Sequence, residues 1–325
     1  MATIGFIVIL IAGLRWNTGT DWGNYLYYFT QIDNRPFGNS GMEIGYEVLV
    51  RSFKTLVSSD PTPFLFFCAI FIVSTTYFTL FKYSPFPLFS LFLLISYSLV
   101  GSGFGVRQDL AIALSFLSIM FIKEREFYKF AIIMVLAALI HNSSLIFFPA
   151  YFLYNFKWTV LNTILIVVVV IVCVLMSETI MQTFGSMVSE NKAETYLEMG
   201  METTKNPYTT LAKGLSGRFL FLLIVIGFVK YGTEKDDFYN GVFNIYVFGI
   251  IIYTIFSPIN LIFSRLARPY DIFQIILLPM AYYQAKRSYK VVIILILFAF
   301  SFLKFSTFVR DDEEVYIPYK TILSQ

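Results

Sequence analysis

The sequence predicts an all-α, polytopic integral membrane protein with about 10–11 transmembrane helices. Hydrophobic residues make up 57% of the 325 residues and charged residues only 14%, and the mean hydropathy is +0.70. Long apolar segments recur along the whole chain, and no polar stretch between them is long enough for a globular domain. We therefore expect a single polytopic membrane domain over residues 1–325.

The predicted spans follow the apolar segments in chain order. They cover residues 2–14, 63–81, 85–101, 109–122, 129–140, 143–156, 158–178, 216–230, 239–257, 268–285 and 290–305. Several are shorter than the roughly 20 residues that a perpendicular helix needs, so they are expected to tilt or to insert partly. The first has neither a basic flank nor a cleavage site, so it does not read as a signal peptide, and a longer chain with an earlier helix stays open.

The short turns between spans indicate the orientation of the chain. One set of turns holds eight of the lysines and two of the arginines, which is typical of the cytoplasmic face. The other face receives six lysines and eight of the ten arginines: Arg15, Arg35, Arg51, Arg107, Arg218, Arg265, Arg268 and Arg310. Because arginine binds phosphate through paired hydrogen bonds, this distribution predicts a phosphate site on the outer face.

Residues 15–62 are predicted to form an outer loop that contains an amphipathic helix. Polar and aromatic residues alternate over 15–25, as in a loop that faces carbohydrate. From Glu43 to Val57 an apolar stripe and a charged stripe recur at helical spacing. Two interpretations stay open: a helix in the membrane interface with solvated charges, or a direct substrate role for Glu43 or Glu47.

Two short outer segments interrupt the apolar pattern. Three alternate glycines, at 101, 103 and 105, precede Arg107 at the start of a predicted span, which suits either close approach of an anion or a tight turn. His141, the only histidine, breaks the apolar stretch over 130–156. A titratable group at a helix end is a candidate catalytic residue, and a structural role is the alternative.

The later outer segments add more arginines. Arg218 lies near the start of a span, while Arg265 and Arg268 precede Pro269, which favours the first turn of a helix. Snorkelling of these side chains at the interface is the alternative. A long polar loop over 179–214 is expected to cover the same face, and residues 306–325 are expected to form an outer tail.

Several of these motifs occur in an order that resembles a known family. The pattern Gly-Leu-Arg-x-x-x-Gly-Thr-Asp-x-x-x-Tyr covers 13–25, and it is followed by Glu-Ile-Gly-Tyr at 43–46, Arg107, Ile-His-x-Ser-x-Leu at 140–145 and Pro-Tyr at 318–319. This order resembles the EpsG family of Wzy-like polysaccharide polymerases, which make O-antigen, exopolysaccharide or capsule. The resemblance implies a GT-C-like helical membrane fold.

The resemblance implies a glycosyltransferase of the bacterial cytoplasmic membrane with its active site on the outer face. The growing glycan would move from polyprenyl diphosphate to a hydroxyl of the next lipid-linked oligosaccharide repeat unit. No nucleotide sugar, cofactor or nucleic acid is expected. Membrane lipid is an expected partner, and a chain-length regulator and a flippase are partners that the resemblance allows.

The departing diphosphate needs its developing charge stabilised, and fixed arginines can do this without a metal ion. We expect Arg107, Arg265 and Arg268 to form this clamp, with Arg15 and Arg218 as supporting members. No metal site is expected.

The acceptor hydroxyl is a weak nucleophile and needs a base. His141 is the first candidate, followed by Asp21 or Glu43. Aromatic side chains are expected to provide surfaces for sugar rings: Trp22, Tyr25, Tyr46 and Tyr270.

Two other classes of function stay open. A ligase that transfers the finished glycan once, to a different acceptor, would use the same chemistry. A flippase or transporter of lipid-linked sugars would place polar residues along several spans, whereas here they gather on one face. A membrane acyltransferase is disfavoured because no His-x-x-x-x-Asp pattern surrounds His141.

Overall fold

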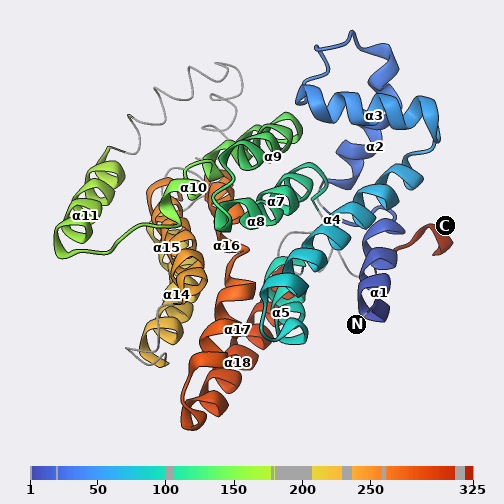
Figure 1. Cartoon of the computed structure of the whole chain (residues 1–325). Helices are drawn as coiled ribbons and strands as arrows, with labels where there is room; N and C mark the ends of the chain where they lie inside the picture. Colours follow the sequence, from blue (N-terminus) through green and yellow to red (C-terminus); the bar gives the residue numbers. More distant parts are fainter. Residues whose placement is uncertain are drawn as a thin grey trace. The chain divides into compact units, whose positions relative to one another are not determined.

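The computed structural model describes residues 2–19, 21–99, 105–176, 179, 207–228, 236–257, 261–311 and 319–324. Over these ranges the regular elements are helices, so the all-α prediction is confirmed (Figure 1). The chain divides into two compact units. Unit 1 consists of Met1–Phe148 with Arg287–Gln325, and unit 2 of Pro149–Lys286. The expected single domain stays a prediction.

Unit 1 contains the N-terminal helices and one late helix. Its α-helices are α1 (Ala2–Gly13), α2 (Trp22–Gln31), α3 (Ile44–Leu56), α4 (Pro61–Tyr83), α5 (Pro87–Leu94), α7 (Arg107–Leu117), α8 (Ile119–Lys123), α9 (Phe127–Ile140) and α18 (Arg287–Asp311). Shorter helical turns are η1 (Ile32–Asn34), η2 (Ile95–Leu99), η3 (Asn142–Phe147) and η5 (Ile322–Ser324). Helix α4 packs against α1 and α7, and α9 packs against α3, α7 and η3.

Unit 2 is organised around one long helix, α15 (Asp237–Phe256), which every other described helix of the unit contacts. These helices are α10 (Ala150–Leu153), α11 (Val160–Leu175), α14 (Pro207–Phe228), η4 (Leu261–Ala267), α16 (Arg268–Asp271) and α17 (Gln274–Gln284). Glycines on α15 allow close packing, because Gly241 lies directly against the ring of Tyr154 and Gly249 against Tyr270.

Each of the eleven predicted spans contains a helix of the structure, although several are broken. Among the described residues, three helical segments are long and apolar enough to cross a membrane: Pro61–Tyr83, Asp237–Phe256 and Arg287–Thr307. The segment predicted over 143–156 is split into η3 and α10 around Pro149, which cannot continue a helix hydrogen-bond ladder. The helices are therefore consistent with a membrane protein, while the number of crossings and the GT-C-like arrangement stay predictions.

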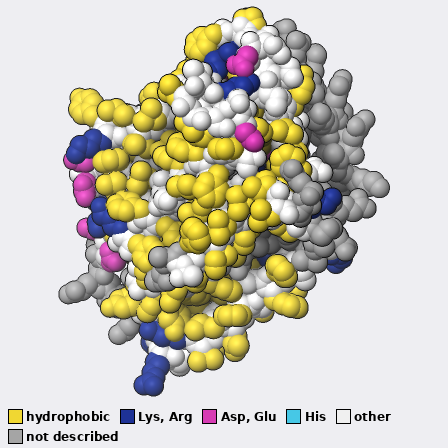
Figure 2. All heavy atoms as spheres, turned by 90° about the vertical axis from the view of Figure 1, so that its right-hand side faces the viewer, with side chains coloured by type: hydrophobic (Ala, Val, Ile, Leu, Met, Phe, Trp, Pro, Cys, Tyr) yellow, Lys and Arg dark blue, Asp and Glu magenta, His cyan; other side chains and the backbone are white. Residues whose placement is uncertain are grey.

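The surface of unit 1 is rich in outward apolar side chains. On α1, Phe6 is 59% exposed, and on α4, Phe78 is 53% exposed. Figure 2, which views the molecule from the side of α1 to α4, shows hydrophobic side chains across the middle of this face and charged ones towards its margins. A continuous apolar surface of this kind is typical of contact with lipid.

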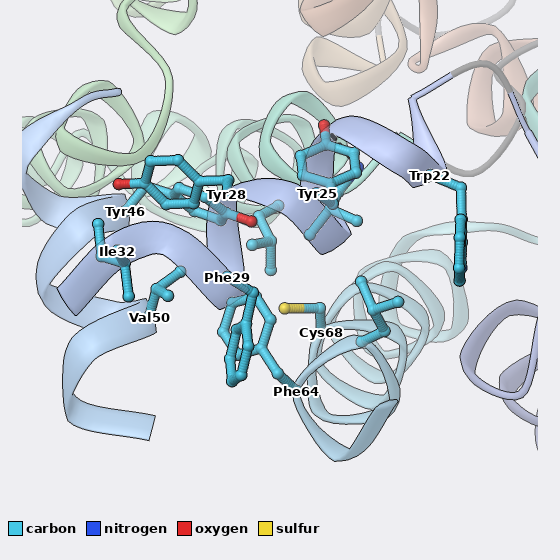
Figure 3. Close-up of a cluster of buried hydrophobic side chains, with 12 residues drawn as sticks. Trp22, Tyr25, Tyr28, Phe29, Ile32, Tyr46, Val50, Phe64 and Cys68 are labelled. Atoms are coloured by element: carbon cyan, nitrogen blue, oxygen red, sulfur yellow. Dashed lines mark hydrogen bonds between the residues drawn. The ribbon is translucent and has the colours of Figure 1, made fainter. Parts of the chain in front are cut away.

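The predicted outer loop over 15–62 contains two helices instead of one. The amphipathic helix expected over 43–57 is α3, whereas α2 was not expected. Both pack on α4 through a cluster of buried side chains in which Tyr46 and Phe64 are nearly inaccessible (Figure 3). Burying a ring such as that of Phe64 stabilises a fold by about 1.5–3 kcal/mol, so this cluster fixes both helices on α4.

Two other expected segments lie partly outside the described residues. Of the loop predicted over 179–214, residues 207–214 belong to α14. Of the tail predicted over 306–325, residues 306–311 continue α18, and residues 319–322 lie beside the segment that follows α1. There Trp16 donates its backbone N–H to Lys320 at 2.9 Å, and Ile322 donates to Leu14 at 3.0 Å.

Candidate functional site

The carboxylate of Glu43 joins two of the predicted site residues in unit 1. Its Oε2 accepts a hydrogen bond from Arg107 Nη1 at 2.5 Å, and its Oε1 lies 3.1 Å from His141 Nδ1. The backbone N–H of Asn142 also donates to Oε1, at 3.3 Å. Glu43 is therefore the centre of a cluster whose members come from three different parts of the chain. We call Glu43, Arg107 and His141 the Glu43 cluster.

Local structure places each of these side chains at the end of a helix. Glu43 has extended backbone and is the residue before α3 begins, while Arg107 is the first residue of α7. His141 also leaves helical conformation, and its backbone N–H closes the last turn of α9. The start of α7 carries the positive end of the helix dipole, which favours an anionic group beside Arg107.

Two tyrosines support Arg107. The hydroxyl of Tyr25 accepts the backbone N–H of Val106 at 3.2 Å and that of Arg107 at 3.4 Å. The guanidinium carbon of Arg107 lies 5.8 Å from the centre of the Tyr46 ring. Tyr25 and Tyr46 are both buried, so in this structure they hold Arg107 in place, and their predicted contact with sugar stays a prediction.

Arg107 has an unused donor. Its Nε is buried and has no hydrogen-bond partner within the described residues, although Nη1 is bound to Glu43. The side chain of Arg107 as a whole is 24% exposed. An arginine with one spare donor and an accessible edge can bind a further anionic oxygen.

The surroundings of Glu43 keep its carboxylate ionised, and the carboxylate determines which ring nitrogen of His141 carries the proton. Burial by itself would raise the pKa of Glu43, but the hydrogen bond with His141 and the charge of Arg107 outweigh burial and lower the pKa to about 2. An ionised carboxylate only accepts hydrogen bonds, so Nδ1 of His141 must be the donor. In a neutral imidazole, Nε2 then carries the lone pair that can accept a proton.

A second buried glutamate one turn further along α3 has a structural role. Glu47 is fully buried and accepts hydrogen bonds from Ser40 Oγ at 2.7 Å, from the backbone N–H of Gly38 at 3.2 Å and from Arg51 Nε at 2.8 Å. Although burial raises the pKa of Glu47, these hydrogen bonds and Arg51 lower it on balance. The network closes the loop that leads into Glu43 and thereby positions it.

The contacts of the Glu43 cluster agree with the predicted threading. Two predicted spans lie between Glu43 and Arg107, and two more lie between Arg107 and His141. An even number of crossings returns the chain to the same face of the membrane, which contact between these side chains requires. The intervening spans are those predicted over 63–81, 85–101, 109–122 and 129–140.

Two other predicted site residues of unit 1 lie elsewhere. Arg15 is 3% exposed and forms an isolated antiparallel bridge with Thr321, beside the segment over 319–322. Asp21 precedes α2 and does not cap it with its side chain, and its charge acts on nearby Tyr25. Their predicted roles as clamp member and base stay predictions.

In unit 2, Arg218 is held by a carboxylate that the sequence analysis did not single out. Arg218 Nε donates to Asp271 Oδ1 at 3.1 Å, its Nη2 donates to Oδ2, and its Nη1 donates to the carbonyl oxygen of Gly214 at 2.9 Å. The ring of Tyr253 lies 3.6 Å from the guanidinium carbon. Each of the three nitrogens of the Arg218 guanidinium thus donates a hydrogen bond within unit 2. Asp271 could have been noticed as the acidic residue that follows Arg268, Pro269 and Tyr270.

The remaining predicted residues of unit 2 flank this pair in sequence. Arg265 lies in η4 and is exposed, whereas Arg268 begins α16 and is half-buried. Tyr270 is fully buried against Gly249. The predicted roles of Arg265 and Arg268 in phosphate binding and of Tyr270 in sugar binding stay predictions.

Apolar helices of membrane-spanning length and a charged cluster at helix ends define an integral membrane protein with a polar site at the ends of its helices. A family model described as the EpsG family matches residues 1–321. The chain therefore belongs to the EpsG family, that of Wzy-like exopolysaccharide polymerases, and the resemblance seen in the sequence is confirmed. No curated protein and no solved structure matches the chain.

Proposed function

We propose that this protein is a polysaccharide polymerase that transfers a growing glycan from polyprenyl diphosphate to a hydroxyl of the next lipid-linked oligosaccharide repeat unit. The observation that carries the proposal is the Glu43 cluster, in which one carboxylate holds a phosphate-binding side chain and a base together. Family membership supports polymerisation of a polysaccharide, and the cluster supplies the two groups that such a transfer needs.

Arg107 stabilises the leaving group. When the bond between the anomeric carbon and the diphosphate oxygen breaks, the electron pair stays with the diphosphate, and negative charge grows on its oxygens. A guanidinium fixed at the start of a helix can stabilise that charge without first having to reorganise. This role requires neither a metal ion nor another cofactor.

His141 removes the proton of the acceptor hydroxyl. The hydroxyl oxygen bonds to the anomeric carbon as the diphosphate leaves, and its proton passes to Nε2 of His141. Glu43 holds Nδ1 and stabilises the imidazolium that forms. Glu43 thus acts as a positioning residue for the base.

The proposal places this reaction on the outer face of the bacterial cytoplasmic membrane. The lysine-rich turns support that orientation, because the predicted threading puts them on the face opposite to Glu43, Arg107 and His141. Arg265 and Arg268 remain proposed members of the phosphate clamp, with Arg15 and Arg218 in support. A flippase would supply the repeat units, and a chain-length regulator would act on the product.

The test is a reconstituted reaction. The purified protein in nanodiscs receives a polyprenyl diphosphate-linked repeat unit, and the products are resolved on a gel. A ladder with release of polyprenyl diphosphate supports the proposal, and the same glycan on a polyprenyl monophosphate serves as the control that should not react. A single transfer that needs a different acceptor would instead establish a ligase. No product from folded protein and its cognate repeat unit would overturn the proposal.

A further inference from the structure

One carboxylate serves two partners in the Glu43 cluster. Arg107 and His141 bind different oxygens of Glu43, at 2.5 and 3.1 Å, so both depend on the same negative charge. Arg107 is always protonated and therefore neutralises much of that charge. As long as Arg107 stays on Glu43, His141 experiences a carboxylate that is already paired.

We propose that a diphosphate bound at this site takes Arg107 away from Glu43, so that the charge of Glu43 acts on His141 alone and makes it a stronger base. The identity of the anion rests on the proposed function. Glu43 thereby couples arrival of the donor to activation of the base. While no leaving group is present, Arg107 and His141 share the charge of Glu43.

The exchange is favourable because Arg107 forms stronger hydrogen bonds and ion pairs with a diphosphate than with a carboxylate. A diphosphate carries more charge and more acceptor oxygens than Glu43, and arginine binds such groups through two parallel hydrogen bonds. The Nε has no partner within the described ranges, and once the side chain has left Glu43 it can make the second of these bonds. The 24% exposure of the Arg107 side chain leaves it accessible to the anion.

The effect on His141 follows from its surroundings. The elements packed against α9 are α3, α7, α8 and η3, and η3 contains no titratable side chain. The charged residue of α8 is Lys123, which lies four residues before α9 begins, whereas His141 follows the last residue of α9. On α3, Glu47 is bound by Ser40, Gly38 and Arg51, which leaves Glu43 to face the imidazole. On α7 the charged groups are Arg107 and Asp109, and the carboxylate of Asp109 lies beside Gly105. Glu43 and Arg107 are therefore the charges whose pairing decides how strongly the imidazolium is stabilised.

The sequence makes a direct measurement possible, because His141 is the only histidine. Protein labelled with 13C at histidine Cε1, purified through a tag without histidine and placed in nanodiscs, gives one imidazole signal. Its titration is followed by NMR with and without inorganic pyrophosphate. We expect pyrophosphate to move the midpoint to higher pH by on the order of 0.5–1 unit.

Pyrophosphate could also act on His141 through its own charge, and Glu43→Gln separates the two effects. This variant keeps the shape of the side chain but removes the charge that competes for Arg107. We expect it to bind pyrophosphate roughly two- to fivefold more tightly, the range for a partly exposed ion pair, and to lose the shift of the midpoint. A purely structural role for Glu43 would produce neither tighter binding nor a selective loss of the shift.

Glu126→Gln is the matched control, since it removes an ion pair with Lys129 elsewhere in unit 1 and should behave as wild type. A wild-type midpoint that ignores pyrophosphate, or a shift that persists in Glu43→Gln, would overturn the coupling. Polymerase activity tests the proposed function separately. If the protein makes a product ladder but the titration of His141 does not respond to pyrophosphate, the proposed coupling is wrong and the proposed polymerase function is still supported.

Discussion

Gly45 lies against Leu139 so closely that a Cβ at position 45 would stand 2.6 Å from the Leu139 Cβ and 2.7 Å from its carbonyl oxygen. Only glycine fits this contact between α3 and α9 without movement of the backbone. Because the contact is two residues from both Glu43 and His141, it determines how near these two side chains approach.

The first prediction follows from this contact. Gly45→Ala should push α3 away from α9, lengthen the distance from Glu43 to His141, and lower kcat by roughly 10- to 100-fold, because small displacements of reacting groups are costly. Gly23→Ala in α2 is the control, since a Cβ there meets nothing within 4 Å. The gel assay measures both variants. Full activity of Gly45→Ala would show that this spacing does not matter for catalysis.

The second prediction concerns the shape of the phosphate-binding group. Arg107→Lys keeps the positive charge but loses the planar fork, so kcat/KM should fall by about 10²- to 10³-fold while the protein still folds. Arg125→Lys, at an exposed arginine in a predicted inner turn, should leave the rate unchanged. Rates equal to wild type for Arg107→Lys would remove Arg107 from the phosphate site.

The third prediction concerns the base. His141→Gln should lower kcat by roughly 10²-fold or more and should abolish the loss of rate that wild type shows when its imidazole becomes protonated at acidic pH. Glutamine can still donate a hydrogen bond to Glu43, so a loss of folding is not expected. The measurement is kcat across the pH range. If kcat of His141→Gln still falls at acidic pH as it does in wild type, His141 is not the base and its role is structural.

The fourth prediction concerns stability at low pH. The pKa of Glu43 is lowered from its ordinary value of 4.5 to about 2, so its ionised form favours the folded state. That contribution is complete above about pH 4.5 and disappears as the pH falls towards 2. Glu43→Gln should therefore be less stable than wild type at neutral pH, and the difference should vanish on acidification. Tryptophan fluorescence during thermal unfolding in detergent, followed at several pH values, measures it.

The fifth prediction concerns unit 2. Asp271→Leu should leave the cation of Arg218 without its carboxylate and lower the free energy of unfolding by about 2–4 kcal/mol. Replacing both partners, with Arg218→Met and Asp271→Leu, should restore most of that loss. Unfolding of the purified variants in denaturing detergent provides the comparison. Failure of the double variant to recover would indicate that the contacts of Arg218 with Gly214 and Tyr253 stabilise the fold more than its ion pair with Asp271 does.

Local sequence patterns predicted much of this fold but not how distant segments meet. The stripe of apolar residues over 43–57 predicted α3 because amphipathic spacing can be recognised within one continuous segment of the sequence. Helix α2 was missed because Gly23 and Asn24 are poor helix formers, and its stability comes from burial of rings such as Tyr25 and Phe29 on its neighbours.

In the site, too, individual residues could be predicted from the sequence but their contacts could not. Glu43, Arg107 and His141 could each be singled out because a charged or titratable residue stands out beside an apolar span. Their mutual contact could not be predicted, since Glu43 is 64 residues from Arg107 and 98 from His141 along the chain. The pair of Arg218 with Asp271 was missed for the same reason, because ion pairing between distant helices leaves no periodicity in the sequence.

The pairing of residues 319–322 with the segment after α1 has a consequence for biosynthesis. Trp16 leaves the ribosome roughly three hundred residues before its backbone partner, Lys320, is made. Until then the segment that leads into α2 lacks these backbone partners, which follow α18 in the chain. The structure around Trp16 is thus completed only after Lys320 has been made, and a chain released by the ribosome before that residue would lack this backbone pairing.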